Sequence, residues 1–393
     1  MQIHKNEKRG NMIKKRHLYS LLFFLCFLIS CSKKNNNFSP DDIKKINSFI
    51  ITDKLSSDKI SYKKEELKID LTLGKNDFSQ LIGFNDKNIF YRIDTSSLDN
   101  LDFINYSYYC YNRISMKSQL LYTTQNCSNI VLEEIYNNDL IIVEVYFDTN
   151  MSFKIKRINN TQENTLLSEI CNGIPIASLI GNKIVFNYQY SQSDIFYQPL
   201  GYINLDNNKY TQLKNPKYYF TDDSNITGTV LQSVDGCNNG FIYECISFND
   251  ENMILDSTGK SQLFYFDFNK NKSYNLPIDF PNKYTYVAGD YKNFITSKYA
   301  FKQPLDNTGQ LYVLNNNTYY KYIIPGICSS NDVIKCYILS NGYILLKTQK
   351  SSYIIDITDK KCNDLSVTNT IKVYQNTIAY MNNNTIYFFN YSM

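Results

Sequence analysis

Histidine and tryptophan are the residue types that this 393-residue sequence almost or entirely lacks. It has no tryptophan and two histidines, His4 and His17, both close to the amino terminus. Beyond residue 17 the chain therefore cannot form a Ser-His-Asp or Cys-His nucleophile, use a histidine as a general base, or bind a metal through imidazole. Of the common enzyme mechanisms, those that rely on carboxylates alone remain open.

Other site signatures are missing as well. The sequence contains no Cys-x-x-Cys pair and no glycine-rich phosphate loop. Asp267–Asn271 is similar to the start of an EF-hand loop, but Lys272 stands where that loop needs glycine. We therefore expect neither a metal nor a cofactor.

The positive net charge of +4 comes from the first 30 residues. They hold six Lys or Arg and one Glu, which leaves 35 basic and 36 acidic residues in the remainder. A nucleic-acid-binding domain needs a basic excess, so we expect no nucleic-acid partner.

Residues 18–30 form an apolar run, LYSLLFFLCFLIS, that follows a basic segment. A run of 13 residues is shorter than the ~20 that a membrane-spanning helix needs. A basic segment, a short apolar run and a small residue before a cut site are typical of a secretory signal. The sequence thus predicts a signal peptide over residues 1–30.

The end of this run, Leu28-Ile29-Ser30-Cys31, resembles the lipobox of bacterial lipoproteins. The resemblance implies cleavage between Ser30 and Cys31, and a lipid (diacylglycerol, with palmitate-type acylation) on the thiol of Cys31. The mature protein would then be anchored to a membrane of the bacterial cell envelope. Ser32 after the cysteine implies the outer membrane if the organism has two membranes.

Residues 31–60 are expected to link the lipid to a folded domain. The stretch 32–38, SKKNNNF, has the composition of a flexible tether. Ser39-Pro40-Asp41-Asp42 has the cap, the first-turn proline and the acidic first turn of a helix. This pattern predicts a short helix over about 40–50.

From residue 61 to 393 the chain repeats one pattern, in which a turn with Asn, Asp or Gly separates two apolar runs. Such turn residues tolerate the positive φ of tight β-hairpins, and spacings near 40–50 residues are typical of propeller blades. We therefore predict an all-β fold, a single β-propeller of about seven four-stranded blades, with six to eight as the range. The predicted hairpins are 83–91, 135–143, 179–186, 235–244, 288–296, 339–346 and 373–380.

A second repeated element reads as strand, polar turn and strand, each time with a lysine seven residues after its start. It occurs at 202–213, 265–276 and 354–365 and predicts the outer half of a blade. The last hairpin is followed by only one more strand. The alternating segment Glu66–Leu73 has the period of a half-buried strand, and we expect it to supply the missing outer strand and close the ring.

Two of these stretches, 255–276 and 305–323, resemble the repeats of TolB-type, WD40-like bacterial propellers. The resemblance covers three or four blades. It implies a fold and no particular activity, and TolB-type propellers often have six blades.

Eight cysteines remain after Cys26 and Cys31. An oxidising compartment permits disulfides, and eight cysteines allow 105 connectivities. We expect some pairs and some buried free thiols.

The function favoured by this pattern is binding or scaffolding, with a protein or a surface polysaccharide as partner. Long loops between strands are the expected binding face, and the candidate residues in or near them are Asp94, Asp194, Asp222, Asp223, Asp256 and Asp306. The alternative is a carboxylate-dependent glycoside hydrolase or lyase, in which Glu133, Glu144 or these aspartates would form the acid pair.

Overall fold

A computed structural model of the chain describes residues 47–391 with gaps. The gaps are 72, 75–76, 97–102, 161, 193–194, 198, 214–227, 238–239, 249–260, 277–298, 303–308, 316–317, 325–332 and 349–350. The chain divides into two compact units, Met1–Ser39 and Pro40–Met393. The first unit, which holds the predicted signal peptide, Ser30 and Cys31, lies outside the described residues.

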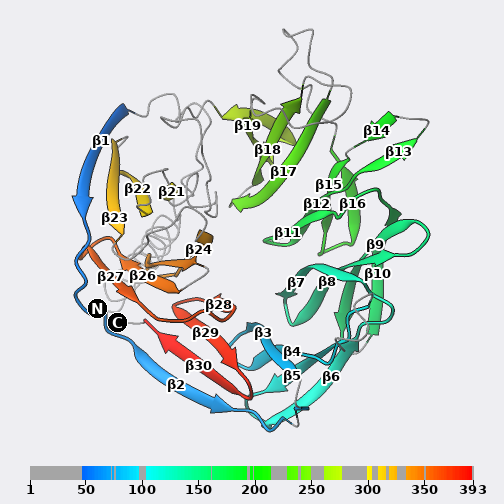
Figure 1. Ribbon diagram of the computed structural model, residues 1–393, viewed down its shortest axis with the longest axis horizontal. Helices are drawn as coiled ribbons and strands as arrows, with labels where there is room; N and C mark the ends of the chain where they lie inside the picture. The colour runs from blue at the N-terminus through cyan, green and yellow to red at the C-terminus, as the bar shows by residue number, and fades with distance from the viewer. Residues whose placement is uncertain are drawn as a thin grey trace, which may run out of the picture. The chain divides into compact units, whose positions relative to one another are not determined.

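The described residues are all-β, and none of them belongs to a helix that could cross a membrane. They form seven four-stranded sheets and one two-stranded hairpin, shown in Figure 1. In pairing order, the first three sheets are β3 to β6 (Phe78–Phe84, Asn88–Asp94, Tyr106–Asn112, Lys117–Thr123); β7 to β10 (Asn129–Tyr136, Asp139–Phe147, Met151–Asn159, Gln162–Ile170); and β11, β12, β15 and β16 (Ile176–Ile180, Lys183–Asn187, Leu200–Asn204, Lys209–Gln212). Two further sheets consist of consecutive strands: β17 to β20 (Gly228–Cys237, Gly240–Phe248, Ser261–Asp267, Lys272–Leu276) and β24 to β27 (Val333–Ile338, Ile344–Thr348, Ser352–Asp356, Lys361–Asp364). The last two sheets take their fourth strand from the amino-terminal segment: β21, β22, β23 and β1 (Tyr299–Lys302, Gly309–Asn315, Thr318–Ile324, Asn47–Lys54), and β28, β29, β30 and β2 (Ile371–Tyr374, Thr377–Asn382, Thr385–Asn390, Lys63–Lys68). The two-stranded hairpin is β13 and β14 (Tyr190–Gln192, Ile195–Tyr197).

Six of the seven predicted hairpins join the first and second strands of a sheet, as in β3–β4 and β7–β8. Their turns use positive φ, as at Asn137 (49°), Asn138 (72°) and Gly181 (59°), which Asn and Gly adopt at low cost. The prediction is therefore confirmed for six hairpins, and 288–296 lies outside the described residues.

The predicted outer elements are also confirmed, as the strand pairs β15–β16, β19–β20 and β26–β27. Each turn is built by its first side chain: Oδ1 of Asp267 accepts hydrogen bonds from the backbone N–H groups of Asn269 and Lys270. Asn204 and Asp356 accept equivalent bonds. The repeated lysine begins the fourth strand in each case.

Consecutive sheets pack through shared apolar cores. Ile142 and Ile158 of the sheet β7–β10 pack with Phe90 and Tyr108 of the sheet β3–β6. Three more clusters join further pairs of consecutive sheets in the same manner, and a fourth joins the sheet of β28 to β30 and β2 to the sheet β3–β6. A Cβ at Gly83 would lie 2.9 Å from Cγ1 of Ile135, so this glycine allows β3 to approach β7. Four-stranded antiparallel sheets that pack face to face in chain order are the blades of a propeller-type fold.

The amino-terminal strands complete two sheets formed near the other end of the chain. β1 pairs in parallel with β23, and β2 pairs antiparallel with β30. Between them, Ser56 bridges Lys361 of β27. The segment 47–68 thus supplies the fourth strand of two sheets and bridges the fourth strand of a third, and the sheets begin before the predicted domain boundary at residue 61.

Two predictions for this segment need correction. The helix expected over 40–50 is wrong for residues 47–50, which belong to strand β1, and residues 40–46 lie outside the described part. The outer strand expected at Glu66–Leu73 is Lys63–Lys68. A fourth strand is mostly exposed, so the apolar alternation belongs to the residues after it: Ile69 is buried in the core between β30 and the next sheet.

Each sheet has two distinct ends. In the sheets that contain neither β1 nor β2, short turns join the first strand to the second and the third to the fourth at one end, which we name the turn end. Connections between the second and third strands, and between sheets, lie at the opposite end, which we name the loop end.

Candidate functional site

Asp94 is the one predicted binding residue that the structure describes. Its Oδ1 accepts a hydrogen bond from the backbone N–H of Ser96 at 2.8 Å, just after β4 ends. This bond caps a turn at the start of the loop. The other predicted residues lie outside the described part of the chain: Asp194, Asp222, Asp223, Asp256 and Asp306.

The loop end of neighbouring sheets exposes large apolar side chains that the sequence analysis did not single out. Their exposed fractions range from 40% at Phe103 to 60% at Ile170. They lie on β3, on the connection between β4 and β5, at the end of β8, and around the connection from β10 to β11. The set is Phe78, Phe103, Phe147, Ile170 and Ile174.

Hydrogen bonds to the segment Cys127–Ser128 hold two of these loops together. The N–H of Ile104, next to Phe103, donates to the carbonyl of Cys127 at 2.8 Å. The N–H of Phe147 donates to Oγ of Ser128 at 3.1 Å. Phe103 and Phe147 are therefore carried by adjacent segments fixed to one another, and they present apolar surface on the same end.

The charge around these apolar residues is negative. Asp94, Asp148 and Glu169 lie in or beside the same loops. The connecting segments 95–105, 148–150 and 171–175 contain no Lys or Arg. The loop end of these sheets therefore combines apolar contact area with acidic surroundings.

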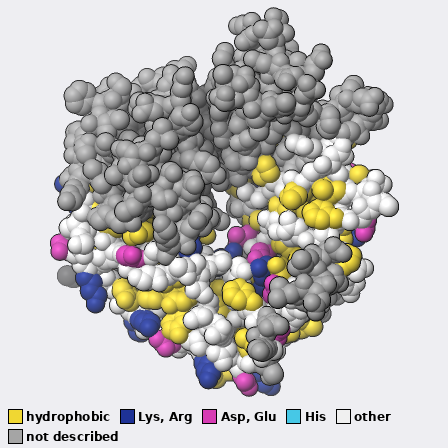
Figure 2. All heavy atoms as spheres, viewed as in Figure 1, with side chains coloured by type: hydrophobic (Ala, Val, Ile, Leu, Met, Phe, Trp, Pro, Cys, Tyr) yellow, Lys and Arg dark blue, Asp and Glu magenta, His cyan; other side chains and the backbone are white. Residues whose placement is uncertain are grey.

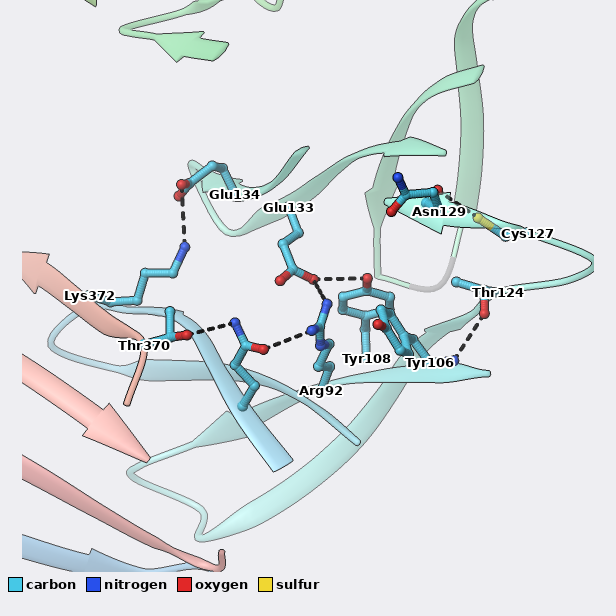
Figure 3. A network of polar contacts seen from close by, with 11 residues as sticks. Arg92, Tyr106, Tyr108, Thr124, Cys127, Asn129, Glu133, Glu134, Thr370 and Lys372 are labelled. Atoms are coloured by element: carbon cyan, nitrogen blue, oxygen red, sulfur yellow. Dashed lines mark hydrogen bonds and ion pairs between the residues drawn. The ribbon is translucent and has the colours of Figure 1, made fainter. Parts of the chain in front are cut away.

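A polar network crosses the interface of three sheets around Arg92 of β4 (Figure 3). Its Nη1 contacts Oε2 of Glu133 at 2.5 Å, and its Nη2 donates to Oε1 of Gln80 at 2.7 Å. Tyr108 donates to the same Glu133 oxygen at 3.1 Å, and the guanidinium lies 4.0 Å from the ring centre of Tyr106. Burial raises the pKa of Glu133, although the charge of Arg92 opposes the rise.

The network extends to the strand β28 in the sheet that also holds β2. Nε2 of Gln80 donates to Oγ1 of Thr370 at 3.2 Å, and Nζ of Lys372 lies 3.3 Å from Oε1 of Glu134. Acidic and basic side chains appear side by side in Figure 2 near the place where these sheets meet. The network therefore ties β3, β7 and β28 together.

A second buried carboxylate, Glu144 of β8, has its own partners. Nζ of Lys156 lies 2.8 Å from it, and the hydroxyls of Tyr122 and Tyr146 donate to it at 2.8 and 2.5 Å. Burial and the adjacent carboxylate raise the pKa of both tyrosines. Burial lowers the pKa of Lys156, but its bonds to Glu144 and Glu163 outweigh this and raise it.

These contacts bear on the glycosidase alternative, which needs two carboxyl groups facing a substrate. Glu133 and Glu144 each pair with a cation in the interface between sheets, and neither lines the two cavities found at the turn end. The Arg92–Glu133 pair joins two sheets, whereas Glu144 and Lys156 lie on the adjacent strands β8 and β9 of one sheet. The geometry therefore assigns both residues to the scaffold.

The larger of these cavities, about 510 Å³, lies at the turn end where the turns β3–β4 and β7–β8 approach β28. Nδ2 of Asn85 and of Asn88 donate to Oδ1 of Asn138 at 2.9 and 3.1 Å. A second cavity of about 160 Å³ includes Lys63 and Arg113 in its lining. The amide bonds connect the turns of two sheets at this end.

Among the residues whose side chains the structure describes, Cys110, Cys127, Cys171 and Cys362 are free thiols. Burial raises the pKa of Cys127 and of Cys362 to about 12, which makes them poor nucleophiles. No group of three potential metal ligands occurs in the part of the chain that the structure describes.

One turn between a third and a fourth strand was not predicted, although its sequence resembles that of the predicted ones. Asn112–Lys117, NRISMK, has the same frame as NLDNNK (204–209), DFNKNK (267–272) and DITDKK (356–361). It forms the equivalent turn between the third and fourth strands β5 and β6. The Arg92 network had no signal, because its partners are far apart in the sequence.

Comparison with known proteins gives structural neighbours only. No family model and no curated protein matches the sequence. Acylaminoacyl peptidase of Pyrococcus horikoshii superposes with a TM-score of 0.48 and 9% identity, over 77% of this chain and 49% of the peptidase. This chain thus spans about half the length of that enzyme. The β-propeller domain of the Trilobed protease from Pyrococcus furiosus has a TM-score of 0.48 and 10% identity, over 79% of this chain and 90% of the domain. The extracellular domain of a one component system protein of B. thetaiotaomicron has a TM-score of 0.44 and 12% identity, over 83% and 40%.

Proposed function

We propose that this chain is a lipid-anchored protein of the bacterial cell envelope whose β-propeller binds a partner protein through the loop end of its sheets. The lipobox-like stretch ending at Cys31 supports the anchor. The pairing of β2 with β30 supports a ring of about seven blades closed by an amino-terminal strand.

The observation that carries the binding role is the apolar set at the loop end. Exposed apolar side chains gathered on one surface of a folded protein mark interaction sites, and aromatic side chains supply much of the contact energy. The set includes Phe78, Phe103 and Phe147 on neighbouring sheets. Its acidic surroundings favour a partner with an apolar centre and basic residues at its rim.

The test uses the full chain in its own cells. A photoreactive phenylalanine analogue replaces Phe147 in one strain and Gln119, exposed on strand β6, in a matched control. We expect a discrete protein adduct from position 147 and none from position 119. A variant with Phe103→Ser and Ile170→Ser should lose the adduct. Equal labelling at both positions, or capture of polysaccharide alone, would contradict the proposal.

The anchor has a separate test. A Cys31→Ser variant should leave the membrane fraction, and mass spectrometry of the amino-terminal peptide should show an acylated Cys31 only in the unaltered chain. An unchanged distribution would exclude the lipid anchor and leave the binding role to be decided by the crosslinking result.

A further inference from the structure

Four turns of this protein share one construction, and one of the four differs in chemistry. In each, an Asn or Asp at the first position accepts a hydrogen bond from the N–H two residues ahead: Ile114 to Asn112 at 3.0 Å, Asp206 to Asn204 at 3.0 Å, Asn269 to Asp267 at 2.8 Å and Thr358 to Asp356 at 2.9 Å. All four end on a lysine. They can therefore be compared position by position.

The turn Asn112–Lys117 is the one with large apolar side chains at its tip. Ile114 occupies the position of Asp206, Asn269 and Thr358, and Met116 that of Asn208, Asn271 and Lys360. The exposed fraction is 77% for Ile114 and 69% for Met116. Since the other turns form with polar residues at these two positions, the turn itself does not require the side chains of Ile114 and Met116.

Met116 also adopts a backbone conformation that suits it poorly. Its φ is 55°, the same value as at the equivalent Asn208. Asn tolerates this left-handed region because its short polar side chain can form local hydrogen bonds, whereas an unbranched apolar side chain forms none. Lys360 at the equivalent position has the same φ of 55°, so the left-handed backbone belongs to the turn, and what distinguishes Met116 is an exposed apolar side chain at this position.

The base of this hairpin is firmly held, which presents the tip outward. Oδ1 of Asn112 accepts a second hydrogen bond, from the N–H of Ser115 at 2.9 Å. Arg113 pairs with Glu65 at 3.0 Å and lies 5.0 Å from the ring centre of Phe388. Ile114 and Met116 are thus displayed on a rigid base rather than packed against the sheet.

The surroundings of the tip are basic. Lys117 begins β6, Lys63 lines the same cavity as Arg113, and the N–H of Arg113 donates to the carbonyl of Lys87 at 2.8 Å. The amino groups of these three lysines have no ion pair with any residue that the structure describes. Two acidic residues, Glu65 and Asp86, line the same cavity. Glu65 is paired with Arg113, and Asp86 has no ion pair with any residue that the structure describes.

We propose that the tip of this hairpin, Ile114 and Met116, inserts into the surface of an anionic lipid bilayer. Apolar side chains enter the boundary between headgroups and acyl chains, while flanking lysines contact anionic headgroups. The acidic loop end of the same sheets then faces away from the membrane and stays open to a partner. Insertion of this hairpin requires neither the partner protein nor the lipid on Cys31, although a lipid anchor would strengthen the binding to the membrane.

The absence of tryptophan from the chain allows a direct test. Met116→Trp introduces a single fluorophore at the tip, and Asn208→Trp introduces one at the matched position of a polar turn. The purified full chain is mixed with vesicles of phosphatidylethanolamine and phosphatidylglycerol, or of phosphatidylcholine alone. Brominated lipids then quench any tryptophan that enters the bilayer.

We expect several-fold stronger quenching and a blue shift for Met116→Trp relative to Asn208→Trp, and a weaker effect in phosphatidylcholine. Equal quenching at both positions, or none in either membrane, would overturn the proposal. So would a blue shift that occurs only after a cell extract is added, because it would identify a protein as the occupant. In an otherwise unaltered chain, Ile114→Asp with Met116→Asn, which copies Asp206 and Asn208, should abolish labelling of this hairpin by a photoreactive lipid.

Discussion

Leu67 of β2 lies directly opposite Ile386 of β30, so two residues near opposite ends of the chain share one sheet. Ile386 is fully buried, in the same core as Ile69. The segment Lys63–Lys68 is therefore part of the folded domain.

Loss of this pairing should destabilise the whole domain. We expect Ile386→Ala to lower the free energy of unfolding by about 2–5 kcal/mol, through lost burial and a residual cavity. Deletion of residues 386–393 should abolish cooperative unfolding, measured by circular dichroism during a urea titration. A truncated chain with an unchanged cooperative transition would show that the β2–β30 sheet is not needed.

The Arg92–Glu133 pair should show strong coupling. Arg92→Met leaves a buried carboxylate without its cation, so we expect a loss of about 3–5 kcal/mol. The double variant Arg92→Met/Glu133→Leu should recover much of this loss. Urea titrations of the wild type, both single variants and the double variant give the coupling energy, and additive losses would exclude the pair as an interface element.

The same pair predicts a pH dependence. Burial already raises the pKa of Glu133, and Arg92→Met should raise it further. A carboxyl with a raised pKa holds its proton more tightly when folded, so the folded state gains stability as the pH falls. The deficit of Arg92→Met relative to the wild type should therefore be smaller near pH 4.5 than at pH 7, and a pH-independent deficit would contradict this account.

Hairpin turns were predictable from the sequence because their signal is local. Asn137 and Asn138 both adopt positive φ, and asparagine is a residue type that favours this conformation. The outer strands were predictable for the same reason, because a lysine at a fixed distance from each turn marks where the fourth strand begins, at Lys209, Lys272 and Lys361. The strand β1 was not predictable, because its partner β23 lies far away in the chain and Ser39-Pro40 provided a competing helix signal. The Arg92 network and the exposed loop-end residues depend on which sheets become neighbours, which no local pattern encodes.

Met116→Asn should stabilise the protein by about 1 kcal/mol, because asparagine tolerates the left-handed backbone. Asn208→Met, at the same φ of 55°, should destabilise it by a similar amount. The melting temperatures of the two variants should thus move in opposite directions. A decrease for Met116→Asn would mean that the methionine packs within the protein.

Alkaline pH should destabilise the fold. Burial raises the pKa of Cys127 and Cys362 from the usual 9.0 to about 12 and raises that of Tyr108 and Tyr391 above 10.0. These groups keep their protons in the folded state. Their contribution to the free energy of unfolding is therefore complete below about pH 9 and is lost as the pH rises toward 12. Urea titrations from pH 8 to 11 should show a falling free energy of unfolding, and iodoacetamide at pH 8 should leave Cys127 and Cys362 unmodified in the folded chain.

The central claim is that the two ends of the sheets have different occupants, and one crosslinking measurement in living cells tests it. A photoreactive residue replaces Phe147 at the loop end in one strain and Ser115 at the turn end in another, each in the otherwise unaltered full chain. The account predicts a protein adduct from position 147 and a phospholipid adduct from position 115. The same class of adduct from both positions would contradict it.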